Sequence, residues 1–182
     1  TSGGIAIVQF NPVNPLQAKA GWQVNQRDHR KLLIIDGRTA FLGGINISNV
    51  YSGSSLNLRH KARTGKPLPW RDTDLQLQGP VVAELQQLFL HTWAAQGGSV
   101  LPAADYLPTP EHVGNAVVRA IGSSPDDPYS QIYVTLIAAL RSAQSEVWIS
   151  NAYFVPDPQL LAAIQQAAGR GGKRELIAAQ PA

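Results

Sequence analysis

The sequence predicts an α/β protein in which a mixed β-sheet is flanked by helices. Short apolar runs rich in β-branched residues alternate with longer segments whose apolar residues recur at helical spacing, and this alternation is typical of a sheet covered by helices. Of the 182 residues, 44% are hydrophobic, which is typical of a globular protein rather than a disordered chain. A proline-rich stretch near the middle predicts two pieces rather than one.

Residues 1–100 form the first predicted piece. Residues 4–10 are apolar and β-branched, and they are predicted to form a strand that ends at Asn11-Pro12. Two apolar runs follow, joined by Asp36-Gly37, a dipeptide that favours the type I′ turn of a two-residue hairpin. After the hairpin we expect a loop at 52–69 and a strand at 70–77. An amphipathic helix should follow at 81–93, ended by two glycines.

Residues 101–112 are predicted to connect the two pieces, because they are proline-rich and show neither periodicity nor an apolar run. Residues 113–182 form the second piece. It is predicted to begin with a strand at 113–121, a turn at 123–127 and a helix at 132–142. A strand at 146–150 and a second helix at 159–168 should follow. Another strand should follow Arg170, but residues 172–182 are less strand-like than this order requires.

Composition and charge narrow the classes of function. The absence of cysteine excludes a disulfide framework, thiolate metal ligands and a cysteine nucleophile. No apolar run approaches the roughly 20 residues that span a bilayer, and no secretory signal opens the chain. The net charge of +3 favours anionic partners, either phospholipid head groups or nucleic acid. One basic cluster is expected to be a solvated loop face: Arg59, His60, Lys61, Arg63 and Lys66.

The residues that point to chemistry lie on both sides of the Asp-Gly turn. With a two-residue loop, His29 would lie opposite Gly44, and Lys31 would lie one pair further along the hairpin. Alternation would then bring His29, Lys31 and Asn46 to one face at the open end. Because Gly44 has no side chain, the space opposite the imidazole is predicted to admit a phosphate.

These groups suit attack on a phosphodiester. The neutral imidazole of His29 is the nucleophile, Lys31 offsets charge on the phosphoryl oxygens, and Asn46 donates a hydrogen bond to one of them. The phosphohistidine intermediate would pass to water or to an alcohol, and no metal is required. Asp36 follows His29 by seven residues of strand, about 23 Å. We therefore expect Asp36 to shape the turn, while Asp72 or an acidic group outside this chain orients His29.

The run from His29 to Asn46, HRKLLIIDGRTAFLGGIN, resembles the HKD motif of the phospholipase D superfamily, His-x-Lys-x4-Asp-x6-Gly-(Gly/Ser)-x-Asn, at every position. The flanking sequences Asn25-Gln26-Arg27-Asp28 and Trp70-Arg71-Asp72-Thr73 resemble those of bacterial cardiolipin synthases. Residues 151–171 resemble the opening strand and helix of that family's second half. The resemblance covers nearly the whole chain.

The resemblance implies two phospholipase D-like halves related by a pseudo-twofold axis, each giving one motif to a shared active site. One histidine would be the nucleophile and the other the general acid and base. The reaction would transfer a phosphatidyl group from a second phosphatidylglycerol or from phosphatidylethanolamine to phosphatidylglycerol at the bacterial cell membrane, giving cardiolipin without a cofactor. The implied catalytic residues are His29, Lys31, Asp36 and Asn46, and the substrate-binding residues are Gly43 and Gly44.

Compared with that family, the chain is expected to start inside the first half and to end before a second motif. Residues 1–100 and 113–182 would then be two incomplete halves. The second motif would come from the missing region or from another chain, and the protein would be peripheral or anchored by a segment not in this chain. We expect little activity from this polypeptide alone unless two copies or a partner rebuild the site.

Two other functions fit the same residues. Single-motif chains of this superfamily dimerise and cleave nucleic acid, but the flanking sequences and the start of a second, non-identical half count against nucleic acid as a partner. The second alternative is a fragment without turnover that binds anionic membranes through the basic cluster at 59–66.

Overall fold

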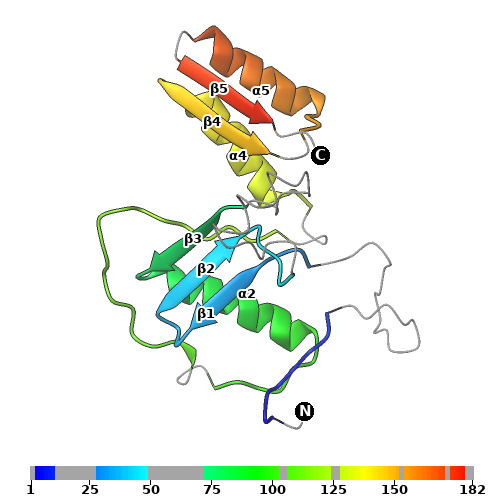
Figure 1. Ribbon diagram of the computed structural model, residues 1–182, viewed down its shortest axis with the longest axis vertical. Coiled ribbons are helices and arrows are strands. Elements are labelled where there is room, and N and C mark those ends of the chain that lie inside the picture. Colours follow the sequence, from blue (N-terminus) through cyan, green and yellow to red (C-terminus); the bar gives the residue numbers. More distant parts are fainter. Residues whose placement is uncertain are drawn as a thin grey trace, which may run out of the picture. The chain divides into compact units, whose positions relative to one another are not determined.

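The computed structural model describes residues 3–10, 28–48, 72–102, 106–123, 128–151, 154–170 and 173–178, the last of these as backbone only. Contacts divide the chain into two compact units, Thr1–Ala120 and Ile121–Ala182, each of which is described by itself (Figure 1). The described residues confirm the α/β class, but their strands form one antiparallel and one parallel sheet rather than a single mixed one. In this part of the chain, no helix combines the length and apolar character needed to cross a membrane.

The first unit contains a three-stranded antiparallel sheet in the order β1-β2-β3. The strands are Leu32–Ile35 for β1, Thr39–Gly43 for β2 and Asp74–Gln78 for β3. They confirm the predicted hairpin and the strand predicted at 70–77, of which residues 70 and 71 lie outside the described residues. The loop predicted at 52–69 lies outside them as well.

The hairpin turn is of the predicted type, but the register of its strands differs by one residue. Asp36 and Gly37 adopt φ angles of 55° and 62°, as a type I′ turn requires. Leu32 nevertheless pairs with Leu42, and Ile35 pairs with Thr39, so three residues separate the paired strands instead of two. The predicted pairing, in which His29 faces Gly44, is therefore wrong.

The buried face of the sheet explains the observed register. A shift of one residue turns a whole strand over, so the register that buries the most apolar side chains prevails. Ala40 is fully buried at the centre of this face, and its small side chain lets a helix approach. Apolar residues from all three strands join it in the core: Leu32, Ile34, Leu42 and Leu77. Under the predicted register, Ala40 would have faced away from Leu32 and Ile34.

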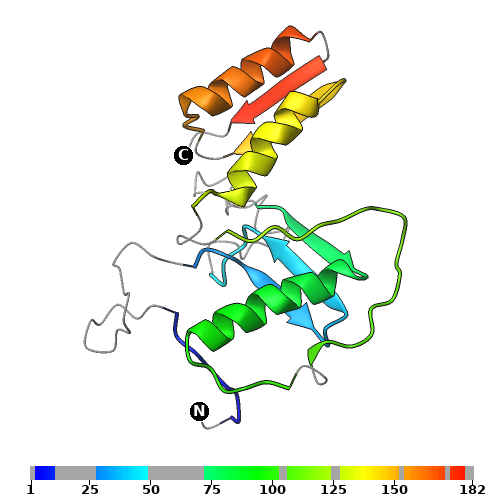
Figure 2. The same ribbon diagram turned by 180° about the vertical axis from the view of Figure 1, so that it is seen from behind.

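Helix α2, Val81–Ala95, covers this face of the sheet (Figure 2) and confirms the helix predicted at 81–93. Its residues Val81, Val82 and Leu85 are buried against Ala40. The helix ends at the predicted glycine pair. Gly97 adopts a φ of 73°, and the N–H of Gly98 donates to the carbonyl of Trp93 at 2.9 Å, which satisfies a carbonyl that the helix leaves open.

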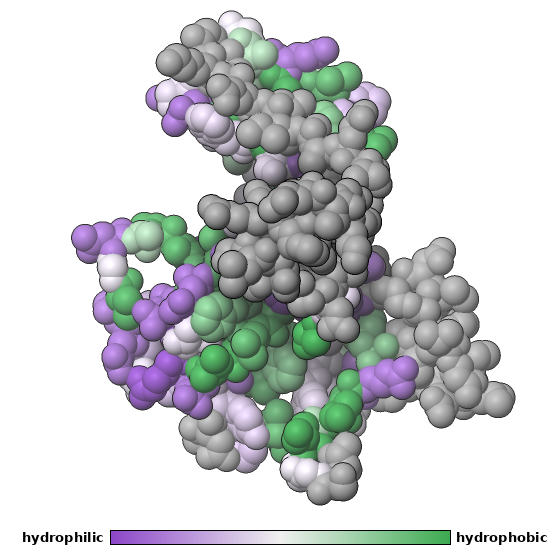
Figure 3. All heavy atoms as spheres, in the orientation of Figure 1, coloured by the Kyte–Doolittle hydropathy of each residue, from purple (hydrophilic) through white to green (hydrophobic). Residues whose placement is uncertain are grey.

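The other face of the sheet carries apolar side chains that remain exposed. Leu33 and Ile35 alternate with the core residues of β1 and are 56% and 45% exposed. Figure 3 views the first unit from this side and shows hydrophobic atoms among hydrophilic ones. The face is thus open over its described residues.

Two predicted strands are not strands in the structure, at 4–10 and at 113–121. A β-branched run forms a strand where a sheet provides both hydrogen-bond partners and a buried face. These runs lack the buried face: Ile5 and Ile7 are 68% and 71% exposed, and the side chain of Val117 is fully exposed. The β-strand propensity of these two runs was therefore not enough to form a strand without a buried face.

Residues 106–120 pack along the first unit. A Cβ atom built on Gly37 in the hairpin turn would lie 2.6 Å from Cδ of Pro108, so the turn and this segment are in close contact. Nη1 of Arg38 donates to Oε1 of Glu111 at 2.5 Å. The N–H of residue 120 donates to the carboxylate of Glu84 on α2 at 3.0 Å. Much of the segment predicted as a connection and a strand therefore covers the turn and the helix.

The second unit follows the predicted alternation: α4 Gln131–Ser142, β4 Glu146–Asn151, α5 Pro158–Gly169 and β5 Lys173–Ala178. Strands β4 and β5 pair in parallel, with α5 as the crossover between them. Strand β5 forms where another strand was expected after Arg170, although residues 172–182 are less strand-like in sequence. The hydrogen bonds that β4 offers compensate for weak local propensity.

Both helices of the second unit pack on one face of its sheet, as Figures 1 and 2 show from opposite sides. The core contains Ile137 and Leu140 from α4 and Ala163 from α5, and Val147 and Ile149 of β4 pack against it. Tyr133 also ties the helices together, because its hydroxyl donates to the Asp157 carboxylate at 2.6 Å. The same hydrogen bond raises the pKa of the tyrosine and lowers that of the aspartate.

Candidate active site at the open end of the hairpin

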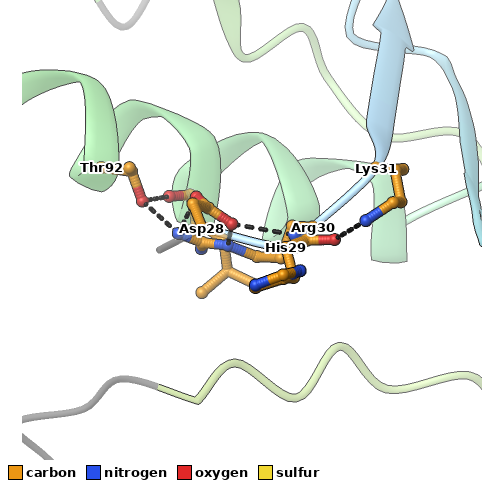
Figure 4. A network of polar contacts seen from close by, with 6 residues as sticks. Asp28, His29, Arg30, Lys31 and Thr92 are labelled. Carbon is orange, nitrogen blue, oxygen red and sulfur yellow. Dashed lines mark hydrogen bonds and ion pairs between the residues drawn. The ribbon is translucent and has the colours of Figure 1, made fainter. Parts of the chain in front are cut away.

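His29 and Lys31 lie in the segment that leads into β1. His29 is exposed and Lys31 is half-buried. The ammonium Nζ of Lys31 donates to the carbonyl oxygen of His29 at 2.6 Å (Figure 4), which holds the cation beside the histidine backbone. Within the described part of the chain, no protein group hydrogen-bonds the His29 imidazole. The structure therefore brings the two predicted residues together and leaves the ring open to a ligand.

The residues on either side of His29 form a compact ion pair. Nε and Nη2 of Arg30 donate to the two carboxylate oxygens of Asp28 at 2.9 and 2.6 Å, and the backbone N–H of Arg30 donates to Oδ1 at 2.9 Å. Nη2 also donates to Oγ1 of Thr92 on α2 at 2.9 Å (Figure 4). This chain of contacts fastens the segment to the helix.

The electrostatics of the pair follow from these contacts. Burial raises the pKa of Asp28, whereas the hydrogen bonds from the Arg30 side chain and backbone, together with the nearby charge of Arg30, lower it. The net result is a lowered pKa for Asp28. The same hydrogen bond raises the pKa of Arg30. Since Arg30 is neutralised by Asp28, Lys31 is the cation beside His29 that is not engaged by a carboxylate within the described residues.

Asp36 lies in the turn, at the far end of β1 from His29. It is exposed, and its φ of 55° is the left-handed conformation that the turn needs. Its position agrees with the expectation that it shapes the hairpin. Its catalytic assignment stays a prediction.

The predicted space beside Gly44 is already occupied. A Cβ atom built on Gly44 would overlap the carboxylate of Asp72, with Cγ at 2.5 Å, and one built on Gly43 would overlap the carboxylate of Asp74. The proposal that Gly44 leaves a gap for phosphate is therefore corrected. The two glycines admit carboxylates from the segment that begins β3, because that strand pairs directly with β2.

Asn46 lies beyond the end of β2, outside the paired ladder. The strand alternation that predicted its convergence with His29 and Lys31 does not extend to it, and the corrected register removes the basis of that prediction. Asn46 is exposed and has an interaction of its own. Its role as a donor to phosphate stays a prediction.

Sequence reasoning missed two functional candidates: Asp28 and Thr92. The sequence Asp28-His29-Arg30 offered a signal, since opposite charges two residues apart can close around the residue between them. Thr92 offered none, because its contact with the hairpin depends on how α2 packs. The basic cluster at 59–66 lies outside the described residues, and so do residues 25–27.

Comparison with known proteins relates the chain to one group of enzymes. It is 36% identical over 174 residues to cardiolipin synthase A of Pseudomonas putida strain W619, covering 93% of this chain and 34% of that protein. It is 35% identical over 184 residues to cardiolipin synthase A of Pseudomonas entomophila, covering 98% and 35%. It is 34% identical over 180 residues to a cardiolipin synthase of Geobacillus kaustophilus, covering 97% and 34%.

The chain spans about a third of the length of these curated relatives. No protein-family model matches it. The likeness covers nearly all of this chain, so it includes both the hairpin and the second unit.

Proposed function

We propose that this chain is part of a phospholipase D-superfamily phosphatidyltransferase of the cardiolipin synthase type, carrying one of two catalytic motifs. The likeness to cardiolipin synthases over nearly the whole chain supports the proposal. The observation at the site that carries it is the pairing of His29 with Lys31, whose ammonium lies 2.6 Å from the His29 carbonyl. A nucleophile and a phosphate-binding cation are thus adjacent on one short segment.

In the proposed reaction, a ring nitrogen of His29 attacks the phosphorus of phosphatidylglycerol. The bond to the leaving glycerol breaks, that alcohol takes a proton from the histidine of the second motif, and a phosphatidyl-histidine forms. A hydroxyl of a second phosphatidylglycerol then loses its proton to the same partner histidine and attacks phosphorus. His29 is released and cardiolipin forms. Lys31 and Asn46 stabilise the charge on the phosphoryl oxygens.

Asp72 is our candidate for the carboxylate that orients His29. The pairing aligns Lys31, Gly43 and Asp74 across the sheet, and Asp72 lies two residues before Asp74, toward the open end of the hairpin. The Asp72 side chain already leans over Gly44. A carboxylate that accepts a hydrogen bond from one ring nitrogen fixes the tautomer and leaves the other nitrogen as the nucleophile.

The proposed reaction also requires a second motif and a phospholipid surface. The second motif would come from a region outside this chain or from another chain, and the two units would belong to the two phospholipase D-like halves. The net charge of +3 suits an anionic phospholipid surface. The membrane association we propose is peripheral, or anchored outside this chain.

The nucleophile is tested with bis(4-nitrophenyl) phosphate, whose leaving group needs no protonation by a second motif. We expect a burst of nitrophenolate and an acid-labile 4-nitrophenyl phosphoryl adduct on a ring nitrogen of His29, located by mass spectrometry. His29→Ala should abolish both. His91→Ala is the matched control, because His91 is an exposed histidine on α2 and should leave both unchanged. An adduct that persists without His29 rules out this role.

The substrate class is tested by offering two phosphodiesters to the chain under the same conditions. As competitors of bis(4-nitrophenyl) phosphate, phosphatidylglycerol vesicles should slow the release of nitrophenolate, and single-stranded DNA should not. Competition by the DNA with none from the lipid would favour a nuclease and reject the transferase.

A further inference from the structure

We propose that Asp28, Arg30 and Thr92 form a clamp that positions His29 for attack on the phosphodiester, an inference that rests on the proposed function. The clamp is built from a bidentate ion pair and one hydrogen bond to α2. Its members act through the backbone of His29 and are positioning residues rather than catalytic ones.

Arg30 closes a ring of bonds around His29. Its N–H and Nε each lie 2.9 Å from Oδ1 of Asp28, and its Nη2 lies 2.6 Å from Oδ2. The two partners are the residues directly before and after His29. Because both neighbours are bound to each other, the backbone torsions of His29 are restricted from both sides.

Thr92 fastens this ring to the body of the unit. Its hydroxyl donates to the carbonyl of Leu88 one helical turn earlier at 3.1 Å, so its lone pairs are free to accept from Nη2 of Arg30 at 2.9 Å. Leu88 packs against the buried core of the first unit. The bonds therefore run without a gap from the His29 segment to the turn of α2 that packs against the core.

The clamp orients the His29 segment and contributes little to the stability of the fold. The side chains of Arg30 and Asp28 are 38% and 22% exposed, and an ion pair at such exposure adds little to folding. A planar guanidinium that binds a carboxylate on two atoms and a hydroxyl on one of them has few orientations left. Lysine carries the same charge but cannot reproduce this geometry.

The clamp also determines which way the nucleophile points. Arg30 reaches toward Thr92 of α2, whereas the His29 imidazole takes no part in the hydrogen bonds drawn around it (Figure 4). His29 is exposed. A ring held in this direction needs less reorganisation before it meets a phosphodiester.

Thr92 supplies the sharpest test, because Thr92→Val removes the hydroxyl and keeps the shape. Backbone hydrogen exchange at residues 28–31 should accelerate, and the rate of adduct formation on His29 with saturating bis(4-nitrophenyl) phosphate should fall about tenfold. The half-saturating concentration should stay the same. Thr92→Ser, which keeps the hydroxyl, should restore both values, and Arg30→Lys should behave like Thr92→Val.

Arg38→Ala is the control, since it removes an exposed ion pair at the other end of the same hairpin and should change neither quantity. Unchanged exchange in Thr92→Val and Arg30→Lys would show that the clamp does not hold the segment. Faster hydrogen exchange at residues 28–31 with an unchanged rate of adduct formation would show that the clamp holds the segment but does not position His29 for attack. If the unmodified protein forms no adduct, the proposed function fails and the positioning role falls with it, while the exchange rates still report whether the clamp exists.

Discussion

Gly43 and Gly44 are neighbours in the chain, but they meet different kinds of atom. A Cβ atom on Gly43 would lie 2.5 Å from the backbone oxygen of Thr73, besides overlapping the Asp74 carboxylate. Thr73 directly precedes Asp74, the first paired residue of β3, so its backbone cannot retreat without disturbing the ladder of β2 with β3. We expect Gly43→Ala to lower the free energy of unfolding by about 1–3 kcal/mol. Urea unfolding followed by circular dichroism measures this, and an unchanged midpoint would contradict it.

Gly44→Ala should affect the site more than the fold. The nearest atoms to its new Cβ all belong to the Asp72 carboxyl group, which can rotate away. We expect a change of less than about 1 kcal/mol in unfolding free energy, since the displaced group is a mobile side chain. The rate of adduct formation on His29 should fall, and Asp72→Ala should lower it to the same degree. Equal loss of stability in both glycine variants would refute the distinction.

The Asp28–Arg30 pair predicts a pH dependence of stability. Burial raises the folded pKa of Asp28, but the hydrogen bonds and the charge of Arg30 together leave it lowered. The contribution of Asp28 to stability is therefore present above the unfolded pKa. That contribution is lost as the pH falls through the folded pKa. Asp28→Asn should therefore lower the unfolding free energy by about 0.5–1 kcal/mol near neutral pH, a figure that allows for solvent screening.

The test compares unfolding free energies of the unmodified protein and Asp28→Asn as the pH is lowered. The difference should shrink below about pH 4 and vanish once Asp28 is protonated in the folded state. A difference that stays constant across this range would mean that the carboxylate charge contributes nothing.

The sequence correctly predicted the place of Asp36 in the turn, and the catalytic roles of His29 and Lys31 stay predictions. It did not predict the neighbours of Gly44, because the contact with Asp72 joins residues that are far apart in the chain. Such contacts follow from the register of three strands, which local patterns do not determine.

Among the elements, the hairpin shows what a local signal can and cannot decide. Asp36-Gly37 correctly predicted the left-handed turn, since both residues need positive φ. The pairing of the strands depended instead on which side chains α2 buries, and Ala40 is the residue that reveals it. The helices α2, α4 and α5 could be predicted from periodicity alone, whereas β5 depends on pairing with β4.

Substitution at Ala40 tests the register. With the observed pairing, Ala40→Leu forces a larger side chain between β2 and α2, and we expect a loss of about 1–3 kcal/mol in unfolding free energy. Ala94→Leu is the matched control, because Ala94 is exposed on α2 and should tolerate the change. If Ala40→Leu and Ala94→Leu have the same unfolding free energy, residue 40 faces the open side of the sheet instead.

For the whole molecule, composition and alternation predicted the α/β class and the order of most elements. The predicted connection at 101–112 and strand at 113–121 concern a segment that instead contacts the first unit up to Ala120. Proline content predicts the absence of regular structure, but it does not say which surface an irregular segment will cover. The ion pair of Arg38 with Glu111 depends on that surface.

The proposed catalytic motif occurs once in this chain, which spans about a third of the length of its curated relatives. A transferase needs a second group to protonate the leaving alcohol and to activate the acceptor, and His29 bound to phosphorus can do neither. Formation of diphosphatidyl product from phosphatidylglycerol in mixed micelles should therefore remain near the background set by His29→Ala when this chain is dilute. If two copies rebuild the site, product per chain should rise with chain concentration. Product per chain that is high and constant down to the lowest concentration would show that one motif suffices.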